Sequence, residues 1–318
     1  MTDARLRIFT GTSNPKLAHD IAAVLNMEVS DALVGTYKNG ETRVRLHENV
    51  RGCDVFIVQS TCMPVDHSIM ELCLMIDAAR RASAKRVTAV IPYYGYARQE
   101  RKTAGREPIS AKLVANMIAT AGAERIVAVD LHAAAIEGFF DIPVDHLRAA
   151  PLLVDHFKQY DLSNAVVVSP DAGGVLRAND FRERVGAPLA IIAKQRPRPD
   201  ELEVMDMVGD VRGKTAIIVD DLISTGSTLT EAARMLMERG AERVWVAATH
   251  AAWVGSPAAE DARNFLKNPC IERIVITDTI QVPHDDRNGK IKVVSVASLL
   301  GEAMMRIYKG LSVSALFH

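Results

Sequence analysis

The sequence predicts an α/β fold made of two similar domains, each a mostly parallel sheet flanked by helices. Short, continuously apolar segments alternate with amphipathic ones, a pattern typical of parallel strands covered by helices on both faces. A strand–loop–helix–strand unit occurs twice along the chain. The 318 residues are enough for two domains that each bury a core.

Ten apolar segments are expected as strands because of their length and their flanking turn residues. They are Arg7–Phe9, Val55–Gln59, Arg86–Ile91, Ile126–Asp130, Ala165–Ser169, Leu189–Ala193, Thr215–Val219, Val244–Thr249, Arg273–Thr277 and Lys292–Ser295. We place the domain boundary near residue 150, which gives domains of residues 1–150 and 151–318. The last helix is a candidate to cross back to the first domain.

The repeated unit is visible when VFIVQSTCMPVDHSIMELCLMIDAARRASAKRVTAVIP is set beside AIIVDDLISTGSTLTEAARMLMERGAERVWVAATH. Gln59 and Ser60 in the first copy stand where Asp220 and Asp221 stand in the second. We therefore expect two related domains, of which only the second keeps an acidic pair at this strand end.

Composition and charge exclude several classes of protein. The formal net charge of -1 argues against a general nucleic-acid binder, which shows a basic excess. No apolar run reaches the roughly 20 residues of a membrane helix, and the N-terminal MTDARLRIFTG lacks the apolar core of a signal peptide. The cysteines form no Cys-x-x-Cys pair, so we expect reduced thiols in a cytoplasmic protein.

The stretch IVDDLISTGST indicates a sugar-phosphate site. A strand that reads as buried ends in Asp220 and Asp221, and residues 224–228 then open a helix. Free N–H groups and hydroxyls at a helix start suit a phosphate, and Gly226 permits close backbone approach. Carboxylates instead accept hydrogen bonds from sugar hydroxyls. The alternative is an ordinary helix cap, which explains the hydroxyls but not the two aspartates.

A basic loop follows the strand that ends near Ile91. The segment YYGYARQERKTAGREPIS carries Arg98, Arg101, Lys102 and Arg106. Arginine forks bind phosphate groups bidentately, so the loop is a candidate to close over a polyphosphate. Taken alone, a solvated basic loop explains these charges equally well.

Three further strand ends carry polar residues, and ligands bind beyond the carboxyl ends of strands in such sheets. His132 and Asp171 are candidate metal ligands, although a histidine often satisfies a local hydrogen bond and an aspartate there often caps a helix. Lys194 and Arg196 in KQRPRP either neutralise charge during phosphoryl transfer or form an ordinary basic turn. Together these parts indicate Mg²⁺-dependent phosphoryl or pyrophosphoryl transfer.

Taken together, the motifs resemble the ribose-phosphate pyrophosphokinase family. The similar segments are PYYGYARQERK, DLHA with GFFDIPVDHL, SPDAGGVLRA, KQRPRP, DD with TGST, and SVSALF. The resemblance runs from about residue 13 to the last residues and implies two phosphoribosyltransferase-like domains. It further implies transfer of the diphosphoryl group of ATP to the C1 hydroxyl of ribose 5-phosphate, giving PRPP and AMP. Mg²⁺ would be the cofactor, and the assembly would be a homohexamer.

The resemblance also assigns roles to single residues. Lys194 would be catalytic, and Arg196 would bind substrate or stabilise the transition state. His132 and Asp171 would bind the Mg²⁺ associated with ATP. The ATP-binding residues would be Arg98, Gln99 and Arg101, together with Tyr37, Asn39, Gly40 and Glu41, which would meet the adenine of a neighbouring subunit's ATP. The ribose 5-phosphate site would consist of Arg196, Asp220, Asp221, Ser224, Thr225, Gly226, Ser227 and Thr228.

The chain departs from the common family pattern at Asn39, Ala193, Gln195 and Ser224. These positions bear on ribose affinity, adenine selectivity and regulation more than on the reaction itself. Two rival functions remain at this point. A phosphoribosyltransferase that consumes PRPP would explain the DD…TGST loop, but it would have neither the basic loop nor a second domain. A regulatory subunit would bind nucleotide without turning it over. The sequence argues against a dehydrogenase, because no Gly-x-Gly-x-x-Gly follows the first strand.

Overall fold

The computed structural model describes residues 5–195, 204–255, 259–282 and 289–316, and the chain divides into two compact units. The first unit consists of Met1–Arg148, Thr279–Gln281 and Ser295–His318. The second consists of Ala149–Asp278 and Val282–Val294. The first unit therefore takes its last helix from the far end of the sequence, a crossing named above as a candidate, although the bounds predicted for the two domains were contiguous.

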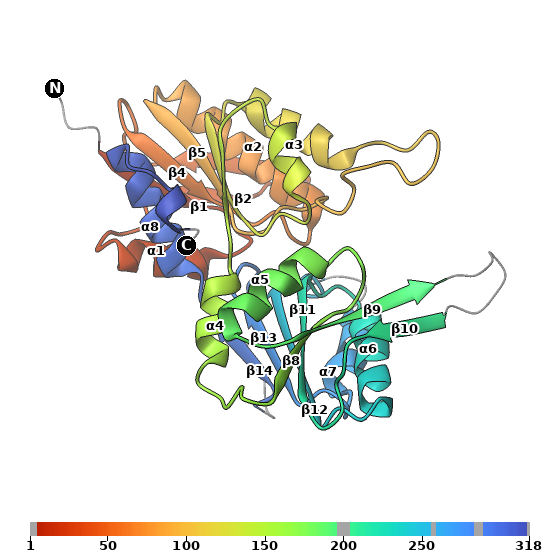
Figure 1. Ribbon diagram of the computed structural model, residues 1–318. Coiled ribbons are helices and arrows are strands. Elements are labelled where there is room, and N and C mark those ends of the chain that lie inside the picture. Colours follow the sequence, from red (N-terminus) through yellow and green to blue (C-terminus); the bar gives the residue numbers. More distant parts are fainter. Residues whose placement is uncertain (1–4, 196–203, 256–258, 283–288, 317–318) are drawn as a thin grey trace. The chain divides into compact units, whose positions relative to one another are not determined.

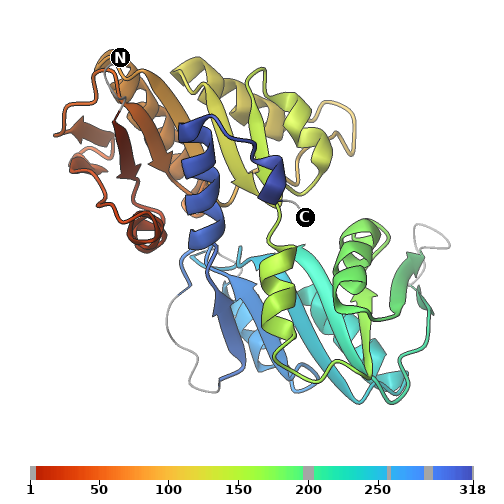
Figure 2. The same cartoon turned by 60° about the vertical axis from the view of Figure 1, so that its left-hand side comes forward.

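A five-stranded parallel sheet forms the centre of the first unit (Figure 1). Its strands lie in the order β1 (Leu6–Thr10), β4 (Asp54–Val58), β5 (Arg86–Ile91), β6 (Arg125–Val129) and β7 (Val144–Leu147). All five residues of β4 are buried, because helices cover both faces of the sheet. Helices α2 (Val65–Arg81) and α3 (Ser110–Ala121) pack on one face. Helices α1 (Pro15–Val24) and α8 (Ala297–Lys309) pack together on the other (Figure 2).

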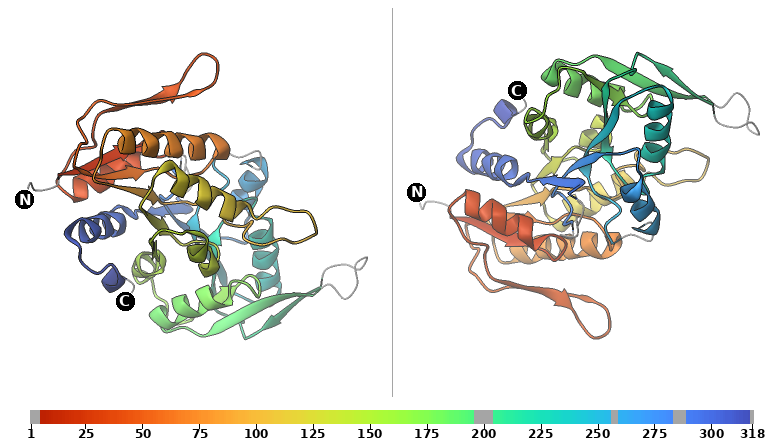
Figure 3. Two further views of the ribbon diagram at one scale, coloured as in Figure 1. Left: turned by 90° about the horizontal axis from the view of Figure 1, so that it is seen from above. Right: turned by 90° about the horizontal axis from the view of Figure 1, so that it is seen from below.

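An antiparallel hairpin projects from the first unit (Figure 3). Its strands are β2 (Ala32–Thr36) and β3 (Thr42–Leu46), and β3 lies against α2. The short 3₁₀ helices η1 (Ala134–Phe139) and η2 (Ser314–Leu316) complete the described elements of this unit. The hairpin tip, residues 37–41, is exposed and so is available to a ligand or to another chain.

A seven-stranded sheet forms the centre of the second unit. Its strands lie in the order β10 (Val204–Val208), β9 (Leu189–Gln195), β8 (Ala165–Ser169), β11 (Thr215–Leu222), β12 (Arg243–His250), β13 (Arg273–Thr277) and β14 (Ile291–Val294). Only the edge strand β10 among these runs antiparallel to its neighbour. Ile217 and Val219 face α4 (Ala150–Phe157) and α5 (Val175–Val185), whereas Ile218 faces α6 (Ser227–Glu238) and α7 (Ala259–Lys267).

The structure confirms the predicted fold class, since both sheets are mostly parallel and flanked by helices. Each of the ten expected strands is present, with ends shifted by a few residues. β11 continues through Asp220 to Leu222, because Leu222 still pairs with His250 of β12. The sequence analysis did not identify β2, β3, β7 and β10, which lie in the hairpin or at sheet edges and are short. None of the helices in the described ranges is both long and apolar enough to cross a membrane.

Candidate active site

The acidic pair lies at the carboxyl end of β11, in the middle of the second unit's sheet. Asp221 is 3% exposed, while Asp220 is half-buried. Nη1 of Arg177, on α5, donates a hydrogen bond to Oδ1 of Asp220 at 3.0 Å, and Nη2 lies 3.2 Å from Oδ1 of Asp221. One planar guanidinium thus bridges both carboxylates, each through a different terminal nitrogen of the arginine fork.

The two carboxylates repel one another more than a single arginine compensates. Burial and the neighbouring Asp221 charge raise the pKa of Asp220 to about 7, against the lowering effect of Arg177. The backbone N–H of Asp221 also donates to Oδ1 of Asp220 at 2.8 Å, which favours the ionised form. Asp220 therefore gains and loses its proton close to neutral pH, so its charge is sensitive to whatever binds beside it.

The loop after β11 enters α6 without a side-chain cap. The N-cap residue is Gly226, whose φ of 76° lies in the left-handed region and which makes no side-chain cap. Oγ1 of Thr225, outside the usual capping position, accepts the N–H of Ser227 at 3.3 Å. A Cβ on Gly226 would lie 2.3 Å from Cγ of Phe265, so packing as well as backbone conformation requires glycine here. This geometry disfavours the helix-cap explanation and leaves the helix start suited to an anion.

The hydroxyls of the same loop lie together. Oγ1 of Thr225 and Oγ of Ser227 form a hydrogen bond of 3.0 Å, while Ser224 and Thr228 are half-buried. Thr225 and Ser227 also line a pocket of about 700 Å³ between α6 and α7, whose walls include Arg234. The loop hydroxyls are therefore accessible to a ligand.

Asp171 follows β8, the strand next to β11. Its Oδ1 accepts the backbone N–H of Gly174 at 2.9 Å, so the aspartate does organise the start of α5 as the capping explanation requires. The side chain is nevertheless exposed, and a carboxylate can accept several further hydrogen bonds or metal contacts. Capping and ligand binding are thus compatible at this residue.

Lys194 lies at the next strand end. The backbone of Lys194 lies in β9, beside β8, and pairs with Met205 of β10. Arg196 lies outside the described residues. Because β9, β8 and β11 are adjacent and parallel, their carboxyl ends bring Lys194, Asp171 and the acidic pair to one edge of the second sheet.

The other predicted residues belong to the first unit. His132 follows β6 and is half-buried. Arg98, Gln99 and Arg101 follow β5, the strand beside β6, and all three are exposed. Oε1 of Gln99 accepts the Ser110 hydroxyl at 2.6 Å, which ties the loop to the start of α3. The arginines thus point their charges to solvent at the same sheet edge as His132.

The hairpin tip carries the remaining four residues, Tyr37, Asn39, Gly40 and Glu41. Tyr37 is 50% exposed, and the guanidinium carbon of Arg43 lies 5.4 Å from its ring centroid. Oδ1 of Asn39 accepts the N–H of Glu41 at 3.3 Å, and Gly40 has a φ of 91° that favours glycine. The turn therefore presents an aromatic face and a carboxylate to solvent, a combination that suits a nucleobase.

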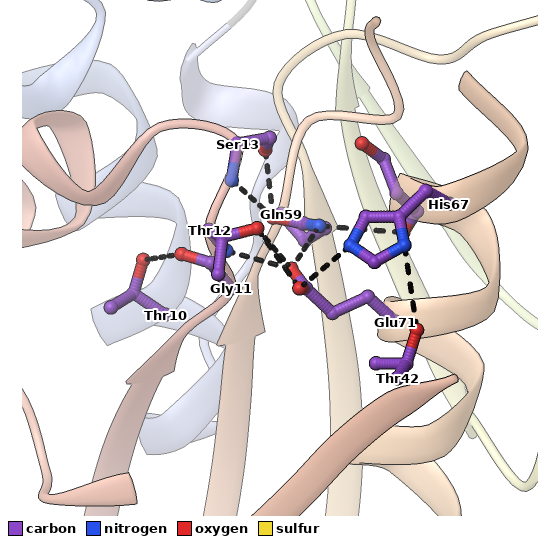
Figure 4. Close-up of polar contacts among 9 residues, drawn as sticks. Thr10, Gly11, Thr12, Ser13, Thr42, Gln59, His67 and Glu71 are labelled. Atoms are coloured by element: carbon purple, nitrogen blue, oxygen red, sulfur yellow. Dashed lines mark hydrogen bonds and ion pairs between the residues drawn. The ribbon is translucent and has the colours of Figure 1, made fainter. Parts of the chain in front are cut away.

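At the end of β4 in the first unit, a buried glutamate occupies the space beside the strand (Figure 4). Glu71 of α2 is 0% exposed, and its Oε1 accepts the N–H of Thr12 at 2.7 Å and Nε2 of Gln59 at 2.6 Å. Its Oε2 accepts the Thr12 hydroxyl at 2.9 Å and lies 3.7 Å from Nε2 of His67. Gln59 in turn accepts the Ser13 hydroxyl at 2.7 Å. Polar groups of this edge are thus satisfied from within the unit.

Sequence reasoning missed Arg177 and Glu71 as organising residues. Arg177 follows the glycine pair of SPDAGGVLRA by one helical turn, and a basic residue at that spacing from Asp171 was a usable signal. Glu71 was hidden inside an amphipathic helix, where a charge is normally read as solvent-facing. Its role depends on the loop that folds over it from residues 11–13, and this contact is not visible along the sequence.

The residues fit Mg²⁺ only as a nucleotide-bound ion. Within the described ranges, no group of three or more histidine, cysteine or acidic side chains could enclose a metal. Mg²⁺ prefers oxygen ligands, keeps several waters and is commonly held by one or two carboxylates with substrate phosphates. Asp171 suits such a site, whereas His132 suits contact through a water molecule or a phosphate oxygen better than direct ligation.

Comparison with known proteins places the chain among phosphoribosyl synthetases. Residues 6–122 match the family model described as the N-terminal domain of ribose phosphate pyrophosphokinase. Residues 193–318 match the model described as the phosphoribosyl synthetase-associated domain. The crystal structure of phosphoribosylpyrophosphate synthetase from Mycobacterium smegmatis is similar with a TM-score of 0.89 and 42% identity, covering 96% of this chain and 99% of that one.

Curated relatives narrow the class to one family. The ribose-phosphate pyrophosphokinase of Caldanaerobacter subterraneus subsp. tengcongensis is 54% identical over 98% of both chains. That of Gloeobacter violaceus is 49% identical over 100% of this chain and 94% of its own length. The chain belongs to the ribose-phosphate pyrophosphokinase family, as its motifs predicted.

Proposed function

We propose that this chain transfers the diphosphoryl group of ATP to the C1 hydroxyl of ribose 5-phosphate, giving PRPP and AMP. The observation that carries the proposal is the end of β11, where Arg177 bridges Asp220 and Asp221 next to the uncapped start of α6. The carboxylates would accept hydrogen bonds from the ribose hydroxyls. The N–H groups and hydroxyls of residues 224–228 would hold the 5-phosphate.

The reaction needs alignment and charge neutralisation more than covalent chemistry from the protein. The C1 oxygen attacks the β-phosphorus, and the bond from that phosphorus to the oxygen bridging it to the α-phosphorus breaks. AMP departs with the bonding electron pair, while the C1 hydroxyl loses its proton. Lys194 and Arg196 would neutralise the charge that develops during this transfer.

The nucleotide would be held by residues of the first unit. Arg98, Gln99 and Arg101 follow β5 and would contact the phosphates, with Arg98 and Arg101 supplying bidentate donors. Bound Mg²⁺ would neutralise part of the triphosphate charge and orient its oxygens. Asp171 would hold the ion directly or through water, and His132 would hold it through water or bind a phosphate oxygen.

The adenine site would be shared between subunits of a homohexamer. The exposed Tyr37 supports this part of the proposal, because an aromatic ring on a projecting hairpin can stack on a base held by another chain. Asn39, Gly40 and Glu41 would complete the contact. Sedimentation that shows only monomers at working concentration would contradict the shared site.

A reducing compartment suits this reaction, and we propose that the protein acts in the cytoplasm. Cys53, Cys62, Cys73 and Cys270 are all free thiols in the structure, which supports the assignment.

The deciding experiment incubates the protein with ATP, ribose 5-phosphate and Mg²⁺ and measures AMP and PRPP together. Equal amounts of the two products are expected. ADP in place of AMP would mean that the γ-phosphoryl group was transferred, and the proposed bond cleavage would be wrong. ATP binding without product would favour a regulatory subunit, and consumption of added PRPP with a free base would favour a phosphoribosyltransferase.

The role of Lys194 has its own test. Lys194→Ala should lower kcat by about 100- to 1,000-fold, because removing a single transition-state donor has effects of that size. KM for both substrates should change much less. A variant with normal kcat and raised KM would show that Lys194 binds the ground state.

A further inference from the structure

The chain makes an unusual turn where it leaves β6. Asp130, the residue after this strand, has a φ of 40°. This is a left-handed backbone conformation that residues other than glycine rarely adopt. Its N–H donates to the carbonyl oxygen of Leu147 at 3.0 Å, which extends the pairing of β6 with β7. Leu131 and His132 follow directly, so the direction of the His132 side chain depends on how this turn is held.

A buried histidine holds the turn from the neighbouring strand. His146 of β7 is 6% exposed, and its Nε2 accepts the backbone N–H of Leu131 at 2.8 Å. Nε2 must therefore carry a lone pair, and the ring proton lies on Nδ1. Nδ1 donates to Oε1 of Glu137 at 2.6 Å, so this carboxylate fixes both the tautomer and the ring orientation.

Burial and the Arg148 charge favour a neutral imidazole at His146. Nη1 of Arg148 lies 3.0 Å from Nε2 of His146 and 3.9 Å from Oδ1 of Asp130. Burial and the Arg148 charge lower the pKa of His146, while Glu137 and Asp130 act in the opposite sense. Glu137 and Arg148 thus hold the ring whose Nε2 accepts the Leu131 N–H.

We propose that His146, oriented by Glu137, is a positioning residue that holds the Asp130–Leu131 turn and thereby aims His132 at the Mg²⁺-bound nucleotide. The inference rests on the proposed function, which gives His132 its ligand. It resembles the support of ligating residues by outer hydrogen-bond partners, whose loss reduces affinity or activity by about 10- to 100-fold. Here the supporting contact acts on the backbone beside the functional side chain.

The test measures AMP formation by full-length variants at varied MgATP and ribose 5-phosphate. His146→Leu leaves the Leu131 N–H without its acceptor. It should lower kcat by about 10- to 100-fold and raise the half-saturating MgATP concentration, with KM for ribose 5-phosphate unchanged. His146→Gln retains an acceptor oxygen and should recover most of the lost activity. Wild-type kinetics in His146→Leu would overturn the inference.

A matched control lies on the same strand. Asp145 accepts a hydrogen bond from Nη1 of Arg125 at 2.6 Å and does not belong to the turn, so Asp145→Asn disturbs the β6–β7 pair alone. This control should keep the wild-type kcat. An equal loss of kcat in Asp145→Asn would mean that general destabilisation of the two strands explains the effect, and the positioning role would be refuted.

Glu137→Leu provides a second variant in case His146→Leu does not fold. The Glu137 side chain is 43% exposed, so its replacement leaves the core intact, yet it removes the acceptor of the Nδ1 proton. A smaller fall in the same kcat is expected, and unchanged kcat would count against the inference. Wild-type protein that forms no AMP would refute the proposed function itself, whereas active wild-type protein with unaffected variants would refute only the positioning role.

Discussion

The ends of β4 and β11 occupy equivalent places in the repeated strand–helix–strand unit, but each surrounds its carboxylates differently. At β4, the carboxylate belongs to Glu71 of α2, is wholly buried and accepts hydrogen bonds from Thr12 and Gln59 (Figure 4). At β11, the carboxylates belong to the strand itself and are bridged by Arg177. At the end of β4, the carboxylate is already hydrogen-bonded by residues of the same unit. At the end of β11, two carboxylates lie side by side and keep oxygen atoms that can accept hydrogen bonds from a ligand.

The loops beside these two strand ends also differ in how their N–H groups are used. In the first unit, the N–H groups of Thr12 and Ser13 donate to Glu71 and Gln59. In the second unit, α6 begins at Gly226 without a side-chain cap, and α2 of the first unit likewise begins at Pro64 without one, so the two units differ in the loop donors and not in the helix caps. Identical topology therefore gives a structural edge in one unit and a candidate binding edge in the other. The difference depends on where the nearest acidic side chain lies.

Removing the bridging arginine should produce the largest effect. Arg177→Leu leaves two largely buried carboxylates without their counter-charge, a change of roughly 3–5 kcal/mol in related cases. If that cost falls on ribose 5-phosphate binding, kcat/KM for this substrate should fall by roughly 100- to 1,000-fold. Arg184→Leu is the matched control, because Arg184 lies on the same helix and, within the described residues, pairs only with Asp180. Similar losses of kcat/KM in both variants would show that Arg177 has no specific role in binding ribose 5-phosphate.

The charge state of Asp220 gives the next largest effect. Its pKa of about 7 in the folded protein lies above the ordinary value of 3.8, so the folded state binds the proton more tightly than the unfolded state does. This stabilisation is complete below about pH 4 and is lost as pH rises through 7. Relative to Asp220→Asn, the wild-type free energy of unfolding should fall by about 2–3 kcal/mol between pH 5 and 8.

Urea unfolding of both proteins across this range measures the difference. A constant difference between them would show that Asp220 does not titrate there. The ionised form is the better acceptor for sugar hydroxyls, so KM for ribose 5-phosphate should decrease over the same interval and do so less in Asp220→Asn.

Glu71 should affect stability rather than substrate use. Glu71→Gln preserves the size of the side chain but turns an amide N–H₂ toward donors at Thr12 or Gln59, which leaves buried groups unpaired. The free energy of unfolding should drop by about 2 kcal/mol. Asp77→Asn is the control on the same helix, since its partner Arg81 is exposed. A large rise in KM for ribose 5-phosphate with normal stability would contradict the structural role assigned to the end of β4.

The smallest effect concerns the Cys62 thiol, which lies in the chain after β4 of the first unit. Burial raises the pKa of the Cys62 thiol from 9.0 to about 11, which leaves roughly 100-fold less thiolate at pH 8 than an ordinary cysteine has. Cys62 should therefore resist alkylation in the folded protein, as followed by peptide mass mapping, while Cys270 in the pocket wall reacts sooner. Rapid labelling of Cys62 would indicate that the first edge opens.

Much of the fold was predictable because buried parallel strands are continuous apolar runs, as Val55–Val58 and Ile217–Val219 illustrate. Strand β3 of the hairpin alternates half-buried and exposed residues and includes Arg43 and Arg45, so its apolar signal is weak. For the candidate site, the motif IVDDLISTGST was enough to predict a sugar-phosphate site. Arg177, Glu71 and His146 were not predicted, because each acts on a segment that only the folded chain brings near.

The return of residues 295–316 to the first unit has a consequence for biosynthesis. During translation, residues 149–294 separate the bulk of this unit from α8, an interval of roughly 7–30 s at 5–20 residues per second. Until α8 is made, the surface of α1 around Val24 and Leu25, which meets Gly301, lacks its cover. The unit that begins the chain therefore completes its folding after the unit that follows it, and a nascent chain stalled before residue 295 would present this apolar helix to chaperones.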